Sequence, residues 1–143
     1  MLLNISYNRP RIKNQIEENI GRAFSLVDRF KMGGIGSGKL VIETTSQQIH
    51  NLLILDSYRN VCSIEMRPQG ILLSFRSLLE TYGLVIPYRK LHIYKGKSQQ
   101  YSIYMDDYFV KVKADEKRIH KFMRKVLDYK ISLSGEGDEN YYN

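Results

Sequence analysis

The sequence has 143 residues, of which 43% are hydrophobic and 26% are charged, and its formal net charge is +7. This length suits a single domain, and the composition excludes collagen-like, coiled-coil and wholly disordered chains. No signal-peptide core precedes Pro10, and no apolar run approaches the roughly 18 residues that a membrane span needs. We therefore expect one cytoplasmic domain over 1–130, followed over 131–143 by a flexible acidic tail that is too polar to order itself.

The positive charge is concentrated in one part of the chain. Residues 89–130 contain 12 Lys or Arg against 5 Asp or Glu, whereas residues 1–88 contain 10 against 7 and residues 131–143 contain 0 against 3. The block 89–130 therefore carries the whole excess of positive charge. Such a block favours contact with phosphates or with another anionic surface.

The first third of the chain combines a helix, a glycine-rich connector and a strand. Apolar residues recur at helical spacing between Ile12 and Phe30, which predicts one helix over 11–31, begun by Pro10. The glycines that follow Met32 would end that helix, and β-branched residues predict a strand over 39–45. The segment 46–57 fits either a short helix or an extended chain, with the helix slightly favoured.

From Asn60 onward, short apolar segments alternate with turn residues, as is typical of an antiparallel meander. The first of these strands is joined to the next by the turn 67–70, and Asp106-Asp107 is interpreted as a later turn. Pro87 lacks a backbone donor, so its strand should bend there or lie at an edge. Further strands are predicted over 71–76, 84–88, 91–94, 99–105 and 108–113.

The last element is an amphipathic helix predicted over 115–130, with a basic opposite face. Its apolar stripe consists of Ile119, Phe122, Met123, Val126 and Leu127. The sequence therefore predicts an α+β fold in which an antiparallel sheet, either a meander or a partly open barrel, has an N-terminal helix and a C-terminal amphipathic helix.

Residue sets that known chemistries need are sparse. The segment Gly33–Lys39 fits the GxxxxGK pattern of a phosphate-binding loop, but a helix precedes it and a strand follows, so we interpret it as a connector. His50, His92 and His120 lack metal-ligand spacing, and Cys62 lies among strand-forming residues as a buried thiol would. We therefore predict no catalytic residue, no cofactor and no metal site.

Lysines beside aromatic residues supply the candidate binding site. Lys111 and Lys113 alternate with apolar residues on one strand and should share a sheet face, and Lys95 and Lys97 flank a nearby turn. These four lysines form a candidate anion-binding patch. The 11 tyrosines include several in this region, where they either stack on nucleobases or simply favour strands.

The order of strands and final helix resembles that of pleckstrin-homology-like domains over about residues 60–130. The segments 70–74 (GILLS) and 85–91 (VIPYRKL) also resemble the bacterial branch of that family. The resemblance implies a scaffold for protein or ligand contacts. The basic signature of its phosphoinositide-binding members is incomplete, because Ser74 stands between Arg67 and Arg76 where a basic residue is expected.

Together these features predict a non-catalytic binding or interaction module that contacts a protein or an anionic surface. Two alternatives remain open. One is a nucleic-acid-binding protein that uses a basic sheet face, because lysines gain affinity for phosphates through counterion release. The other is a small enzyme assembled from Tyr, His and Asp residues.

Overall fold

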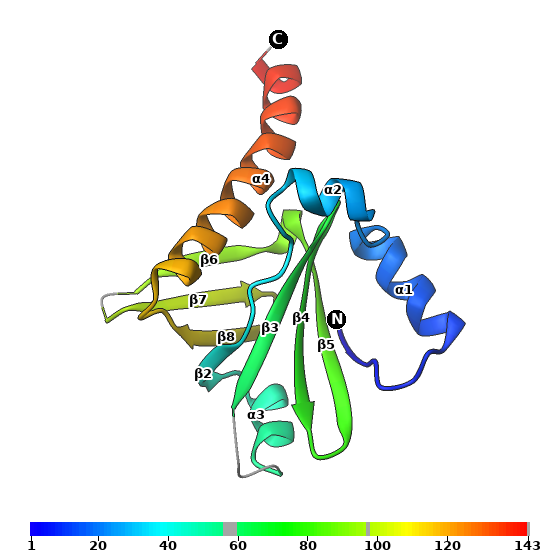
Figure 1. Ribbon diagram of the computed structural model, residues 1–143, viewed down its shortest axis with the longest axis vertical. Helices are drawn as coiled ribbons and strands as arrows, with labels where there is room; N and C mark the ends of the chain where they lie inside the picture. The colour runs from blue at the N-terminus through cyan, green and yellow to red at the C-terminus, as the bar shows by residue number, and fades with distance from the viewer. Residues whose placement is uncertain (56–59, 97, 143) are drawn as a thin grey trace.

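The computed structural model describes residues 1–55, 60–96 and 98–142, with the backbone alone over 135–142. It confirms an α+β fold with an open antiparallel sheet of eight strands, an N-terminal helix and a C-terminal helix (Figure 1). The helices are α1 (Pro10–Ile20), α2 (Leu26–Lys31), α3 (Gln47–Leu53) and α4 (Lys117–Tyr142), and a 3-10 turn spans Tyr88–Lys90. The strands are β1 (Leu2–Asn4), β2 (Leu40–Thr45), β3 (Val61–Arg67), β4 (Gly70–Ser77), β5 (Glu80–Pro87), β6 (His92–Lys95), β7 (Gln100–Met105) and β8 (Tyr108–Lys113).

Strand β2 joins the two halves of the sheet, whose strand order is β1-β5-β4-β3-β2-β8-β7-β6. Its first residues pair with β3, with Leu40 opposite Cys62, and its later residues pair with β8, with Ile42 opposite Val112. The register shifts immediately after Ile42, as at a β-bulge, and such an irregularity bends a strand. The two halves therefore turn toward each other around β2 (Figure 1).

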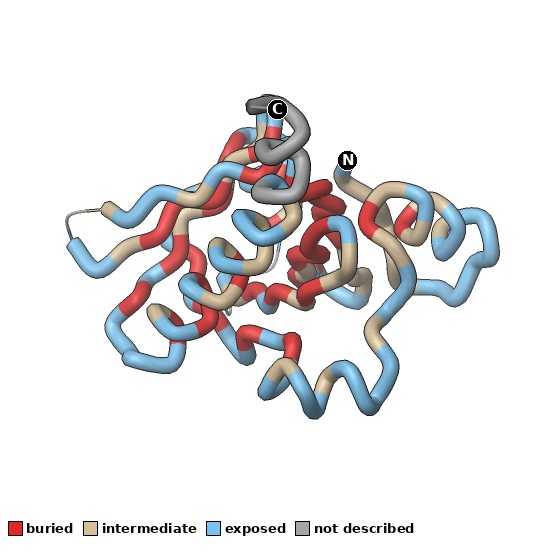
Figure 2. Tube along the Cα trace, turned by 90° about the horizontal axis from the view of Figure 1, so that it is seen from above, coloured by how far each residue is buried: buried red, intermediate tan, exposed pale blue. Residues whose placement is uncertain are grey.

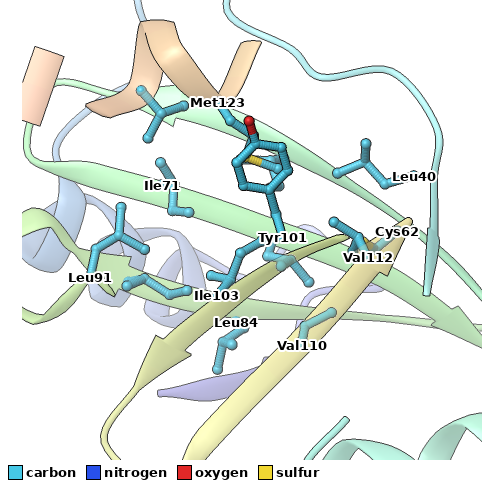
Figure 3. Packing of buried hydrophobic residues seen from close by; sticks show 14 of the residues in the cluster. Leu40, Cys62, Ile71, Leu84, Leu91, Tyr101, Ile103, Val110, Val112 and Met123 are labelled. Carbon is cyan, nitrogen blue, oxygen red and sulfur yellow. The ribbon is translucent and has the colours of Figure 1, made fainter. Parts of the chain in front are cut away.

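The main core lies between these halves and α4. Ile71 and Leu84 from one half, Ile103 and Val110 from the other, and Met123 from α4 are all fully or almost fully buried and lie close together (Figure 3). The predicted apolar stripe of the C-terminal helix is buried at Ile119, Phe122, Met123 and Val126, which confirms the packing expected of that helix. Leu53 and Ile49 bring α3 into the same cluster.

A smaller second core covers the opposite face of β4 and β5. Ile16 and Ile20 of α1 pack there against Leu72 and Val85. Strand β1, which the sequence did not indicate, extends this part of the sheet by pairing with β5, so that Leu2 lies opposite Leu84. Both faces of the β4–β5 hairpin are therefore partly buried, one by the main core and one by α1.

The prediction of one helix over 11–31 is wrong, because two helices occupy that segment. Gly21 has φ +86°, its amide closes α1 on the carbonyl of Glu17, and the ring of Pro68 lies 3.3 Å from the position that a Cβ atom would take. The chain thus turns away as it passes the β3–β4 turn. Helix α2 begins only after Ser25, whose side chain accepts a hydrogen bond from the amide of Asp28 at 3.2 Å.

The remaining boundaries differ more modestly from the predictions. Strand 39–45 and a helix within 46–57 are found as β2 and α3, although residues 56–57 lie outside the described residues. Strand β5 begins at Glu80 rather than Leu84, and it ends at Pro87, where the predicted bend is the 3-10 turn. Asp106-Asp107 forms the predicted turn, with Asp106 at φ +52°. Helix α4 continues beyond residue 130, where the tail was predicted to begin, as far as Tyr142.

No helix within the described residues combines the length and the apolar character that crossing a membrane requires.

Candidate functional site

Among the side chains that the structure describes, the most exposed group of large apolar residues on one helix lies on α2. Leu26, Val27 and Phe30 are 81%, 62% and 88% exposed, and their spacing places all of them on one face of the helix. We call this set the α2 apolar face. The helical spacing between Ile12 and Phe30 predicted one continuous helix, but the chain breaks at Gly21, and Val27 and Phe30 are exposed on the separate helix α2. Figure 2 shows the exposed segments of the chain in pale blue.

Contacts made by Arg29 and by the residues that flank α2 hold this helix in place. The ring of Phe24, just before α2, meets the ring of Tyr129 on α4 edge to face, with centroids 6.1 Å apart. Arg29 donates a hydrogen bond from Nε to the carbonyl oxygen of Phe24 at 3.0 Å, and Met32 packs against the main core. The exposure of the α2 apolar face therefore belongs to an anchored helix rather than to a free chain end.

Aromatic side chains form a row across the outer face of β6, β7 and β8. Tyr94 lies 5.6 Å from Tyr104, and Tyr104 lies 5.8 Å from Phe109, measured between ring centroids. The Nζ atom of Lys111 lies 5.7 Å from the centroid of Phe109, which is cation–π distance. We call Tyr94, Tyr104, Phe109 and Lys111 the aromatic–lysine face. The inner face of the same strands supplies Tyr101, Ile103, Val110 and Val112 to the core.

The structure separates Lys95 from Lys111 and Lys113, the three lysines of the predicted anion-binding patch that it describes. Lys111 and Lys113 share the outer face of β8, as the alternation predicted, and Nζ of Lys113 pairs with Asp115 at 3.5 Å. Lys95 lies opposite Tyr101 and lines the cleft between β6 and α4, on the other side of the sheet from Lys111. Lys97 lies outside the described residues. Phe109 and Lys111 are two residues apart on β8, so strand alternation in the sequence already places them on one face. Only the pairing of β6, β7 and β8 brings Tyr94 and Tyr104 to the same face.

The glycine-rich segment Gly33–Lys39 is held by α4 through its carbonyl groups. Arg118 donates to the carbonyl oxygens of Ser37 and Lys39, both at 2.8 Å, and Lys125 donates to those of Gly33 and Gly34 at 3.2 and 3.1 Å. The amides of Gly33, Gly34 and Ser37 donate to protein carbonyls. A phosphate-binding loop needs those amides free, so this geometry supports the interpretation of a connector. Arg118 and Lys125 belong to the basic block 89–130, so part of that block serves to hold this connector against α4.

A groove of about 740 Å³ lies over the outer face of β3, β4 and β5 beside the start of β2. Its polar lining consists of Lys39, Arg76 and the hydroxyl-bearing residues Ser63, Ser74 and Thr81. Such a set suits a small anion, and the volume is typical of ligand sites. Arg67, the other basic residue of the hairpin, is used internally, because it donates to the carbonyl of Gly21 at 3.0 Å and pairs with Glu65.

The β4–β5 turn places two leucines at the surface. Leu78 has φ +57°, a conformation that favours glycine or asparagine, and Leu79 is 89% exposed. This turn was not predicted, because leucine is not a usual turn residue. This hairpin tip lies at the same end of the molecule as α3, since Ser77 donates to the carbonyl oxygen of Leu52.

Two titratable groups that catalysis could use, Cys62 and His120, are buried or hydrogen-bonded. Burial raises the pKa of Cys62 to about 12, which removes it as a nucleophile at neutral pH. His120 Nδ1 lies 2.9 Å from the hydroxyl oxygen of Tyr101, so this histidine already has a hydrogen-bond partner. Across the described ranges, no group of three His, Cys, Asp or Glu side chains is placed to bind a metal ion.

Comparison with models of protein families finds no match, and comparison with curated protein sequences finds no significant match.

Proposed function

We propose that this protein is a non-catalytic interaction module that binds a protein partner through the α2 apolar face. The observation that carries the proposal is the exposure of Leu26, Val27 and Phe30 on an anchored helix. Burying one such side chain gains about 1.5–3 kcal/mol, so a surface that leaves three of them in water is suited to a partner that covers them.

A short amphipathic helix whose apolar face points outward also has a known recognition geometry. Leu26 and Phe30 are four residues apart, and Val27 and Phe30 are three apart, which is the spacing of anchor residues that enter an apolar groove. Aromatic anchors commonly dominate the energetics of such contacts. Phe30 is therefore the residue whose removal should weaken the interaction most.

Site-specific photocrosslinking tests this proposal. A benzophenone analogue of phenylalanine at position 30 keeps an aromatic ring in place, and the same analogue at position 7 serves as a control, because Tyr7 is also well exposed at 57%. In extracts of the source cells we expect a discrete adduct from position 30 and none of the same size from position 7. Unlabelled wild-type protein should suppress this adduct.

A competitor variant makes the test quantitative. The double change Leu26→Ser and Phe30→Ser alters exposed residues, so its stability should stay within about 0.5 kcal/mol of wild type. We expect this variant to fail as a competitor. Equal competition by wild type and variant, or identical adducts from positions 30 and 7, would contradict the proposal. An adduct of twice the chain mass would identify the partner as a second copy of the chain.

We further propose that the scaffold is pleckstrin-homology-like. Two features support this proposal. The antiparallel strands β3 to β8 follow one another in the chain and lead directly into α4, and they lie in the sheet on the two sides of β2. An experimental structure, compared strand by strand with domains of that family, tests the assignment. A different connectivity of the strands would reject it.

A further inference from the structure

The aromatic–lysine face differs chemically from the α2 apolar face. Three ring side chains follow one another across neighbouring strands, and Tyr94 is 59% exposed. The pairing register explains the row. Tyr104 lies opposite Phe109 on one side and His92 on the other, and Tyr94 lies two residues beyond His92 on the same face of β6, opposite Ser102. Rings arranged in this way present π-faces and edges rather than the branched aliphatic surface that suits simple apolar burial.

Cationic groups lie beside the rings. The ammonium group of Lys111 sits over Phe109, and Lys113 follows on the same face of β8. Acidic groups on these strands and beside them include Asp115, which pairs with Lys113, and Glu43, which accepts a hydrogen bond from Gln100 at 3.2 Å. Asp106 and Asp107 form the β7–β8 turn, and Asp106 pairs with Lys90 at 3.3 Å. Lys111 is therefore the cation most directly available to a ligand that lies on the rings, and the chain as a whole carries +7.

The combination of aromatic rings and a lysine narrows the class of ligand that this face could bind. A neutral sugar would use the rings but gain nothing from the lysine, and a duplex hides its bases from a flat sheet face. Unpaired bases stack on aromatic side chains on a sheet surface while lysines contact the phosphates between them. We propose that the aromatic–lysine face is a binding site for single-stranded nucleic acid, with Tyr94 and Phe109 as stacking residues and Lys111 as a phosphate contact.

This site is separate from the α2 apolar face, so the two proposals can fail independently. The test measures the binding of dye-labelled oligothymidine and oligouridine of about 15 nucleotides to the protein. Fluorescence anisotropy gives the affinity at about 50 and 200 mM salt. We expect weak, sequence-tolerant binding that loses at least tenfold in affinity over this range if several phosphates are contacted. A duplex of the same length should bind more weakly at each salt concentration.

Matched variants assign the binding to this face. Tyr94→Ala should weaken binding by about tenfold, whereas Tyr7→Ala, which removes a tyrosine of nearly equal exposure at 57%, should leave binding unchanged. Lys111→Ala should lower the logarithmic salt slope by up to about 0.7, and Lys13→Ala, which removes an exposed lysine of α1, should lower it less. Phe30→Ser should not affect oligonucleotide binding.

Several results would overturn the proposal. These are an absence of binding at about 50 mM salt, equal affinity for the duplex and the single strand, and equal losses in Tyr94→Ala and Tyr7→Ala. Adducts with a protein, formed by a photoreactive group at position 94 and unaffected by excess oligonucleotide, would instead assign this face to a protein partner.

Discussion

Gly70 offers the sharpest test of the packing between α1 and the sheet. It lies at the start of β4, opposite both Arg67 and Pro87. A Cβ atom added there would lie 2.3 Å from the carbonyl oxygen of Ile86 and 2.4 Å from Cγ2 of Ile20, whereas ordinary contacts begin near 3.4 Å. Gly70→Ala therefore requires atoms of β5 and α1 to move apart by about 1 Å.

The cost of this displacement follows from which atoms must move. Ile86 is paired with Ile71 in the β4–β5 ladder, so its carbonyl cannot swing away without disturbing that ladder. Ile20 is fully buried in the second core and has little free space around it. Overpacking usually costs 1–3 kcal/mol, and a rigid backbone neighbour places this change at the upper end, about 3 kcal/mol. For a chain of this size the melting temperature should fall by about 10 °C.

Urea unfolding followed by far-ultraviolet circular dichroism measures the effect. We expect a lower midpoint at an unchanged m-value, because the compactness of the native and unfolded states should not change. Gly36→Ala is the matched control, since a Cβ atom there meets no atom within 4 Å, and its stability should stay within about 0.5 kcal/mol of wild type. A Gly70→Ala protein as stable as the Gly36→Ala protein would refute this account of α1 packing.

Three further predictions concern the core, a strained turn and the buried thiol. Phe122→Ala should lower the free energy of unfolding by about 3–5 kcal/mol, because it empties a buried aromatic site, and full stability in urea would reject the packing of α4. Leu78→Gly should raise stability by about 1 kcal/mol, since φ +57° suits glycine, and an unchanged melting temperature would argue against strain in this turn. Cys62 should resist alkylation at pH 8 until the protein unfolds. Because burial raises its pKa to about 12, its contribution to stability should be complete below about pH 8.5, where the unfolded thiol begins to ionise, and should be lost as pH rises toward 12. Rapid labelling of the folded protein would contradict this prediction.

Local periodicity in the sequence determined most of the elements. The alternation along β8 correctly placed Val110 and Val112 inside and Lys111 and Lys113 outside, because side chains of a strand point to opposite faces in turn. The stripe from Ile119 to Val126 likewise identified the buried face of α4. Patterns of this kind reflect the geometry of near neighbours in the chain, so the sequence alone is enough to identify them.

Tertiary contacts decided what periodicity could not. The helical spacing between Ile12 and Phe30 is continuous, yet the chain breaks at Gly21 because it must pass the ring of Pro68 and accept a hydrogen bond from Arg67, both distant in sequence. Because of that break, Phe30 does not continue the apolar face of α1 and is exposed on α2.

The candidate sites depended on the fold in the same way. The sequence grouped Lys95 with Lys111, but pairing of β6 with β7 places Lys95 on the α4 side of the sheet and brings Tyr94 beside Tyr104 on the other side. A one-residue difference in position along a strand reverses the face on which a side chain lies. Composition thus determined that the chain carries excess lysine and tyrosine, while strand register determined which of these side chains form one surface.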